Sequence, residues 1–135
     1  MGAIHAGWRG TAADLVGKTV RAMQAYFGTK PEDISGAIGP NIGVCCFETD
    51  SDVPAAIRSM MGTQAEPFIR QTGEKYHVDL KGINRALLER AGVSQVDVSV
   101  ECTACRPDRF WSHRVMGQDR GSMAAIIVCK GEGNA

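Results

Sequence analysis

Apolar residues recur at helical spacing over the stretch that follows residue 11. They fall on one face of a helix, whereas Asp14, Lys18, Arg21 and Gln24 fall on the other. Thr11 is a suitable N-cap, and Gly28 follows the last periodic residue. The pattern predicts one amphipathic helix from Thr11, with its apolar stripe packed in the core. The stripe comprises Leu15, Val16, Thr19, Val20, Met23 and Phe27.

Two more segments show the same periodicity. The first begins at Ser51 or Asp52, accommodates Pro54 in its first turn and ends before Gly62. Its inner face is expected to consist of Val53, Ile57, Met60 and Met61. The second is capped by Asp79 and stopped by Gly92. Its inner face is expected to consist of Leu80, Ile83, Leu87, Leu88 and Ala91.

Short apolar or alternating runs predict the strands. They lie at residues 1–4, 34–38, 45–48, 75–80, 96–100, 110–114 and 123–129. The last run is almost wholly apolar, which predicts a central strand. Residues 62–73 carry the least pattern and are expected to be the most mobile, and residues 131–135 are expected to fray. Helices and strands mix without strict alternation, which favours an α+β (mixed α/β) fold with a mixed sheet covered by helices.

Length and composition favour one globular domain spanning residues 1–135. The chain is 44% hydrophobic and 22% charged, and its 15 Lys and Arg balance its 15 Asp and Glu. A net charge of zero gives the chain no overall positive potential that would attract nucleic acid or an anionic membrane. Any anion site must therefore be local. Five cysteines, with no signal segment and no apolar span of about 18 residues, favour free thiols in a reducing cytoplasm.

The cysteines form two groups. Cys102 and Cys105 make a C-x-x-C, which suggests zinc or dithiol chemistry. A structural zinc site requires a second such pair or paired histidines, so Cys102 is expected to pack near a site instead. Cys45 and Cys46 are adjacent, and in an extended chain they would point to opposite sides and not share a metal. The loop before them, Gly39–Gly43, favours positive-φ glycines.

The first eleven residues concentrate the candidate chemistry. A short apolar run ends at His5, turns through Gly7 and Gly10, and reaches the expected helix start at Thr11. The first N–H groups of a helix have no internal partner and favour anions. Arg9 adds a fixed positive charge with a planar fork of donors, and His5 adds a ligand or an acid–base group. An anion beside a histidine is the ligand that this stretch predicts.

The stretch His5–Thr11 (H-A-G-W-R-G-T) resembles the signature of the laccase-domain family. Further matches follow in the family's order: Gly39–Gly43, Cys46–Glu48, Asp79 and Leu80 with Asn84, Cys102 with Thr103, Phe110–Arg114 and Gly121–Ala125. The resemblance covers nearly the whole chain but only the C-terminal portion of the family. The family's preceding segment, with a His-Gly and an Asp-Cys-x-Pro motif that supply two zinc ligands, is not in this sequence.

That family was described first as multicopper polyphenol oxidases, and later as zinc-dependent purine nucleoside phosphorylases with adenosine deaminase activity. The resemblance implies that His5 is a zinc ligand in a His₂Cys site that activates water for deamination or positions a nucleoside for phosphate attack. It implies phosphate binding by Arg9, the helix start at Thr11 and Arg114. Cys102 and His113 become candidate catalytic residues, and Trp8 either stacks on a purine or fills the core.

Three alternatives stay open. A copper-dependent polyphenol oxidase needs several copper ligands, which His5, His77 and His113 alone hardly supply. A cysteine hydrolase would pair Cys102 or Cys105 with His113, whereas a Ser112–His113–Asp119 triad has poor geometry because neighbouring residues point apart. A non-enzymatic half-domain would associate with itself or with a separate N-terminal half through an exposed apolar surface.

Overall fold

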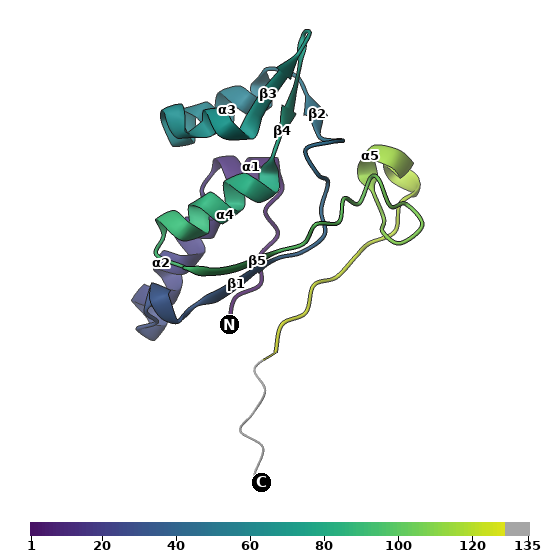
Figure 1. Cartoon of the computed structure of the whole chain (residues 1–135). Helices are drawn as coiled ribbons and strands as arrows, with labels where there is room; N and C mark the ends of the chain where they lie inside the picture. The colour runs from purple at the N-terminus through teal and green to yellow at the C-terminus, as the bar shows by residue number, and fades with distance from the viewer. Residues whose placement is uncertain (129–135) are drawn as a thin grey trace.

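The computed structural model describes residues 1–128, which form helices and strands in mixed order (Figure 1). In chain order the elements are α1 (Trp8–Ala12), α2 (Leu15–Phe27), β1 (Ser35–Ile38), β2 (Glu48–Thr49), α3 (Asp52–Met61), β3 (Ile69–Thr72), β4 (Lys75–Val78), α4 (Leu80–Arg90), β5 (Gln95–Val98) and α5 (His113–Met116). Short 3₁₀ helices lie at Pro31–Asp33, Gly62–Phe68 and Gly117–Asp119. The mixed α/β class predicted from the sequence is confirmed.

The strands of the described part form two small sheets. β1 and β5 pair in parallel, with Ser35 opposite Gln95 and Ile38 opposite Val98. β4 lies between β2 and β3 in an antiparallel sheet of three strands. α4 runs along the β1–β5 pair (Figure 1), and Gly36 permits this close approach, since a Cβ there would lie 3.1 Å from Leu88 Cδ1.

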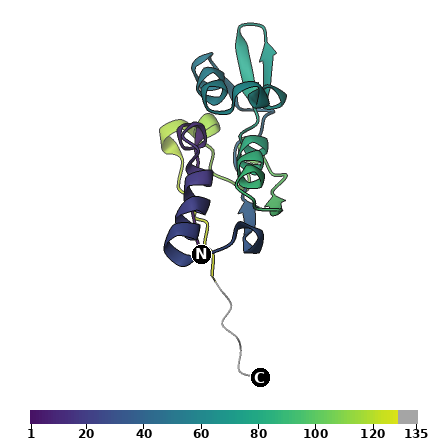
Figure 2. The ribbon, with the colours of Figure 1, turned by 90° about the vertical axis from the view of Figure 1, so that its left-hand side faces the viewer.

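The core is built where α3, α4 and β4 meet. Viewed from the side, α1 and α2 stand as one column beside a second column that holds α4 (Figure 2), and α2 packs against α4. The buried cluster consists of Val16, Phe47, Val53, Ile57, Met61, Ala65, Val78, Leu80, Ile83 and Leu87. Three of the four residues predicted for the inner face of α3 and three of the five predicted for α4 are in this cluster, so periodicity located these helices correctly.

The single helix predicted from Thr11 is wrong, because the chain breaks at Asp14. Asp14 adopts a left-handed conformation (φ 51°), which separates α1 from α2, and its carboxylate accepts a hydrogen bond from the Gly17 N–H at 3.2 Å. Arg21 and Arg90 hold the same carboxylate at 3.1 and 3.7 Å. Asp14 is therefore the N-cap of α2, whereas Gly28 (φ 63°) ends that helix as predicted.

Several predicted strands are also absent from the described part of the chain. Residues 1–4 are exposed and belong to no strand, and residues 110–114 form no strand, since His113 and Arg114 already belong to α5. The apolar run 123–128 is exposed, with Ile126 88% accessible, so a central strand is wrong there; Cys129 and the tail 131–135 lie outside the described residues. An apolar run forms a strand only when a neighbouring strand pairs with it.

One other difference concerns packing. The core position predicted for Phe27 is wrong: its side chain is 78% exposed, since α2 extends past the elements that cover its earlier turns. Residues 62–73, the segment with the least sequence pattern, contain a seven-residue 3₁₀ helix and strand β3, and their expected mobility stays a prediction. Within residues 1–128, no helix combines the length and the apolar character that a bilayer crossing requires.

Candidate functional site

His5 and Arg9 line the same surface hollow, and both belong to the segment in which the sequence concentrates the candidate chemistry. The hollow has a volume of about 230 Å³ and is lined by His5, Gly7, Trp8, Arg9 and Gly10. Both His5 and Arg9 are exposed. The Arg9 guanidinium carbon lies 4.3 Å from the centroid of the Trp8 ring, and Trp8 packs against the core cluster. Trp8 thus serves as a platform that orients Arg9.

Thr11 is not among the residues that line this hollow. Its side chain is fully buried and its hydroxyl accepts a hydrogen bond from Asn84 Nδ2 at 3.1 Å. The hydroxyl lies 3.2 Å from Asn84 Oδ1, to which it donates. Asn84 Nδ2 also donates to the Leu80 carbonyl at 2.9 Å. Thr11 is therefore not an N-cap: it ties α1 to α4, and we give it a structural role in the site proposed below.

The helix mouth that was expected to attract an anion is different in the structure. α1 has only five residues, and Gly7 at its N-cap provides no side-chain hydrogen bond. The longer helix α2 begins beyond Asp14, whose own carboxylate already occupies its N-terminus. The positive charge that this surface offers an anion is therefore the Arg9 guanidinium and not a helix dipole.

The second predicted pair, His113 and Arg114, lies on α5. The Arg114 guanidinium donates to the carbonyls of Cys46 (3.2 Å) and Glu48 (2.8 Å), so it anchors α5 to the segment before β2. His113 Nδ1 lies 3.2 Å from the Gly117 carbonyl. Within residues 1–128 no hydrogen bond joins His113 to Cys102 or Cys105, so the cysteine hydrolase pairing gains no geometric support. A phosphate contact by Arg114 stays a prediction.

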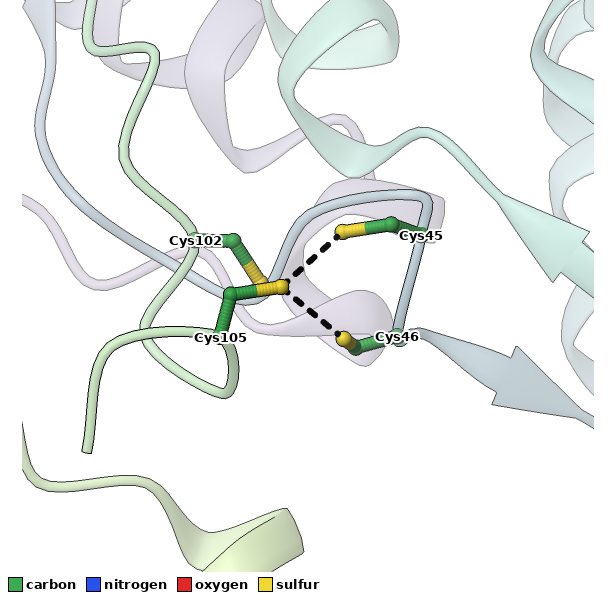
Figure 3. A group of neighbouring side chains, drawn as sticks. All are labelled: Cys45, Cys46, Cys102 and Cys105. Atoms are coloured by element: carbon green, nitrogen blue, oxygen red, sulfur yellow. Dashed lines mark hydrogen bonds between the residues drawn. The ribbon is translucent and has the colours of Figure 1, made fainter.

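The structure gathers four cysteines at one point (Figure 3). The sulfur atoms of Cys45, Cys46, Cys102 and Cys105 all lie within 4.8 Å of one another. Cys105 Sγ is 3.4 Å from Cys46 Sγ and 3.6 Å from Cys45 Sγ. Four soft sulfur ligands at this spacing can hold a metal ion. Among residues 1–128 this is the one grouping of three or more potential ligands, and His5 is not part of it.

The cysteines meet because two parallel strands end at the same edge. One cysteine pair follows β1 and the other follows β5. Beyond the strands the two chains stay side by side: the Ser99 N–H donates to the Ile38 carbonyl at 2.9 Å and the Thr103 N–H to the Asn41 carbonyl at 3.0 Å. The carboxyl ends of adjacent parallel strands emerge together, so both cysteine turns are delivered to one place.

The prediction that Cys45 and Cys46 point to opposite sides is wrong. The N–H groups of Cys46 and Phe47 both donate to the Gly43 carbonyl, at 3.0 and 2.9 Å, so the chain turns here instead of running as a strand. The turn brings both sulfurs to Cys105. A signal was present in the sequence: each cysteine pair follows a predicted strand, and parallel pairing of those strands would bring the pairs together.

Gly43 is required for the close approach of the two turns, not for a positive φ. The glycines of the described part that have positive φ are Gly28, Gly62, Gly73, Gly92 and Gly117, so the positive-φ prediction for the Gly39–Gly43 loop is wrong. A Cβ on Gly43 would lie 3.2 Å from Cys102 Cβ and 3.3 Å from Cys45 Sγ. Its N–H donates to Cys102 Sγ at 3.2 Å.

The thiols of the cluster have different pKa values: that of Cys102 is lowered, and those of Cys45 and Cys46 are raised. Burial opposes ionisation of Cys102, but the backbone N–H groups of Gly43, Cys105 and Ala104 favour the thiolate and lower its pKa to about 6. The hydrogen bond with Cys105, aided by burial, raises the pKa of Cys46 to about 12. Burial and the contact with Cys105 raise the pKa of Cys45 as well. Cys102 is therefore the thiol that ionises most readily, whereas Cys45 and Cys46 stay protonated beside it.

Comparison with known proteins adds a consistent set of similarities. A family model described as multi-copper polyphenol oxidoreductase laccase matches residues 1–130. Purine nucleoside phosphorylase YlmD of Geobacillus stearothermophilus is 39% identical over 131 residues, which are 95% of this chain and 47% of that protein. Human purine nucleoside phosphorylase LACC1 is 31% identical over 135 residues, 96% of this chain and 31% of that protein.

Solved structures agree with the fold. The crystal structure of YlmD from Geobacillus stearothermophilus superposes with a TM-score of 0.77 at 41% identity, over 82% of this chain and 42% of that chain. The YfiH protein of Bacillus licheniformis gives a TM-score of 0.78 at 38% identity, over 82% and 43%. The chain thus spans less than half the length of these relatives.

Proposed function

The chain belongs to the multi-copper polyphenol oxidoreductase laccase family, and we propose on that basis that it contributes to phosphorolysis of purine nucleosides. The observation that carries the proposal is the hollow of His5 and Arg9, which lies in the motif that resembles the family signature. Similar proteins of the family are named purine nucleoside phosphorylases. Because the chain covers about half of these bacterial relatives, the activity of the whole protein is part of the proposal.

In this proposal Arg9 binds and orients phosphate. Its planar fork of donors matches two phosphate oxygens, and the charge-assisted hydrogen bonds offset the negative charge of the nucleophile. The Trp8 ring restricts the guanidinium, since it lies 4.3 Å from the ring centroid. A pre-oriented guanidinium loses less conformational freedom when phosphate binds.

His5 carries the proton in this proposal. A phosphate oxygen attacks C1′ of the ribose, the new C1′–O bond forms and the bond from C1′ to the base nitrogen breaks. The proton of the attacking phosphate ends on the departing base, and the exposed His5 imidazole beside Arg9 transfers it. The products are ribose 1-phosphate and the free purine, so no redox partner is needed.

The family's zinc has no part in these steps. A catalytic zinc takes three protein ligands, whereas the described residues supply only the His5 imidazole at this hollow and place His5 in no cluster of three. The donor set present does not fit the ion. Adenosine deamination needs a metal-activated water, and no step of it is derived from the residues present.

The histidines of the described part also do not favour the multicopper alternative. His77 Nδ1 lies 2.8 Å from the Val44 carbonyl, and His113 Nδ1 is engaged with Gly117. The metal-competent grouping found within residues 1–128 contains no histidine. A multicopper site gathers several imidazoles, and these histidines are not gathered.

We further propose that the chain associates, either with itself or with a partner chain. Large apolar side chains are exposed along two segments, with Val100 96%, Ile126 88% and Val128 73% accessible. Association would remove this apolar surface from water. Sedimentation at micromolar concentration should show a species larger than the monomer, and a stable monomer would contradict the proposal.

The test of the function is hypoxanthine release from inosine by the purified chain, with and without phosphate. Release is expected only with phosphate, and a phenolic dye should stay unoxidised. Arg9→Lys keeps the charge but loses the fork, so the KM for phosphate should rise roughly tenfold or more. Arg70→Lys, on exposed strand β3, is the matched control and should change nothing.

Two outcomes would contradict the proposal. One is the absence of both phosphate-dependent release and saturable binding of phosphate. The other is release that Arg9→Lys and Arg70→Lys affect equally. His5→Gln adds a second readout, because loss of the proton carrier should lower kcat and alter its pH profile while the KM for phosphate stays near that of the unmodified chain.

A further inference from the structure

We propose that Cys45, Cys46, Cys102 and Cys105 bind one zinc ion in tetrahedral coordination, at a site that does not include His5. The four sulfurs come from two turns that follow the neighbouring parallel strands β1 and β5 (Figure 3). Nothing in the phosphorolysis proposed above uses this cluster. The zinc would join the two turns and so stabilise the carboxyl-terminal edge of the β1–β5 pair.

The spacing of the sulfurs fits a single ion. A tetrahedral zinc with Zn–S bonds of about 2.3 Å places its ligand sulfurs about 3.8 Å apart. The structure has 3.4 Å between Cys46 and Cys105 and 3.6 Å between Cys45 and Cys105, and no pair exceeds 4.8 Å. Small side-chain rotations therefore suffice. A disulfide requires about 2.05 Å, so Cys105 would have to move further to bond to Cys45 or Cys46 than to share an ion with them.

The backbone around the cluster is arranged as a second shell for thiolates. The Gly43 N–H donates to Cys102 Sγ at 3.2 Å, across the two turns. Hydrogen bonds to ligand sulfur orient the ligand and spread its negative charge, and their loss weakens metal sites. The absence of a side chain at Gly43 is part of this arrangement, because a Cβ would press on both Cys102 and Cys45.

The residues around the cluster can also compensate the charge of the zinc–thiolate group and leave the site open to solvent. Four thiolates around Zn²⁺ leave a net negative charge, and the Arg114 guanidinium is held beside the ligand turn by the Cys46 carbonyl at 3.2 Å. Cys45 and Cys105 are exposed while Cys102 is buried. An ion can therefore enter from solvent and be held against a buried ligand without unfolding of the chain.

Zinc is favoured over other ions by the ligand set. Four sulfurs in a compact tetrahedron are typical of structural zinc, whereas hard cations such as magnesium take oxygen ligands. The sequence expectation that a second C-x-x-C is needed does not apply here. The adjacent pair Cys45–Cys46 sits in a turn and so supplies the second half of the site.

The experiment is a titration of the reduced, metal-free chain with Co²⁺ followed by Zn²⁺. One equivalent of Co²⁺ should produce intense thiolate-to-cobalt charge transfer and the visible bands of tetrahedral cobalt, and one equivalent of Zn²⁺ should abolish both. Cys105→Ser removes the sulfur closest to two others and should weaken binding at least tenfold. Cys129→Ser, which removes the chain's fifth cysteine, is the matched control.

His5→Ala separates this site from the proposed active site: it should leave the cobalt spectrum intact while phosphorolysis is lost. Absence of a charge-transfer band under reducing conditions would overturn the inference. Equal binding by Cys105→Ser and Cys129→Ser would overturn it as well. Circular dichroism of the metal-free variants confirms that they keep the fold, and a rise in Tm on adding zinc, absent in Cys105→Ser, is the second readout expected.

Discussion

Replacement of Thr11 by Val should destabilise the chain through one buried hydrogen-bond pair. The substitution keeps the side-chain volume but removes the hydroxyl, which accepts from Asn84 Nδ2 at 3.1 Å and lies 3.2 Å from Asn84 Oδ1. Asn84 is only 5% exposed, so water cannot replace the lost partner, and Oδ1 is left without a donor. A buried polar group left unpaired costs about 1–3 kcal/mol. That is a large share of a typical stability of about 5–15 kcal/mol.

The assay is urea unfolding of Thr11→Val, Asn84→Ala and the double variant. Thr11→Val leaves Asn84 Oδ1 without a donor, and Asn84→Ala leaves the Thr11 hydroxyl with only the Ala6 carbonyl, at 3.4 Å. The double variant leaves neither group unpaired between these two positions. The double variant should therefore be more stable than the sum of the single effects predicts, by about 1 kcal/mol or more. The m-value should stay unchanged. Strict additivity, or a loss below about 0.5 kcal/mol for Thr11→Val, would refute the reasoning.

Three other variants or conditions test separate parts of the account. Ile83→Ala removes a fully buried side chain from the core and should lower the free energy of unfolding by about 2–5 kcal/mol; a smaller loss would show that the core collapses into the space. Gly43→Ala forces a Cβ to within 3.2 Å of Cys102 Cβ and should weaken cobalt binding roughly 10–100-fold, unlike Gly39→Ala, where a Cβ meets nothing. The pKa of Cys46 is raised to about 12 and that of Cys45 is raised too, so both are protonated near neutral pH and metal binding must release their protons. Calorimetry in buffers of different ionisation enthalpy should detect this release, and affinity should rise with pH; an affinity flat between about pH 6 and 8 would contradict it.

Local features of the fold could be predicted from the sequence. The Asp79 cap is confirmed by its hydrogen bond from the Gly82 N–H at 3.0 Å, and the Gly28 stop by its positive φ. The break at Asp14 was not predicted, because its left-handed conformation leaves no mark on the periodicity, and one of its ion-pair partners, Arg90 of α4, is distant in the sequence. Periodicity describes one element at a time, and such a contact joins two.

The same distinction applies to the sites. His5 and Arg9 line one hollow because they belong to one contiguous motif, so the sequence alone places them close together. The cysteine cluster depends on parallel pairing of β1 with β5 and on the turn at Gly43. Neither is visible in the local pattern, which indicated an extended chain at Cys45 and Cys46. The pairing of strands is a tertiary property, and it decides which loops meet.

The most direct measurement of the central claim is an NMR titration of the ¹⁵N-labelled chain with phosphate and then with inosine. If His5 and Arg9 form the binding surface, phosphate should shift the Arg9 Nε resonance and the amides of Gly7 and Gly10, and inosine should then shift the His5 ring signals. Shifts confined to other parts of the chain, or no saturable shifts at all, would contradict the account.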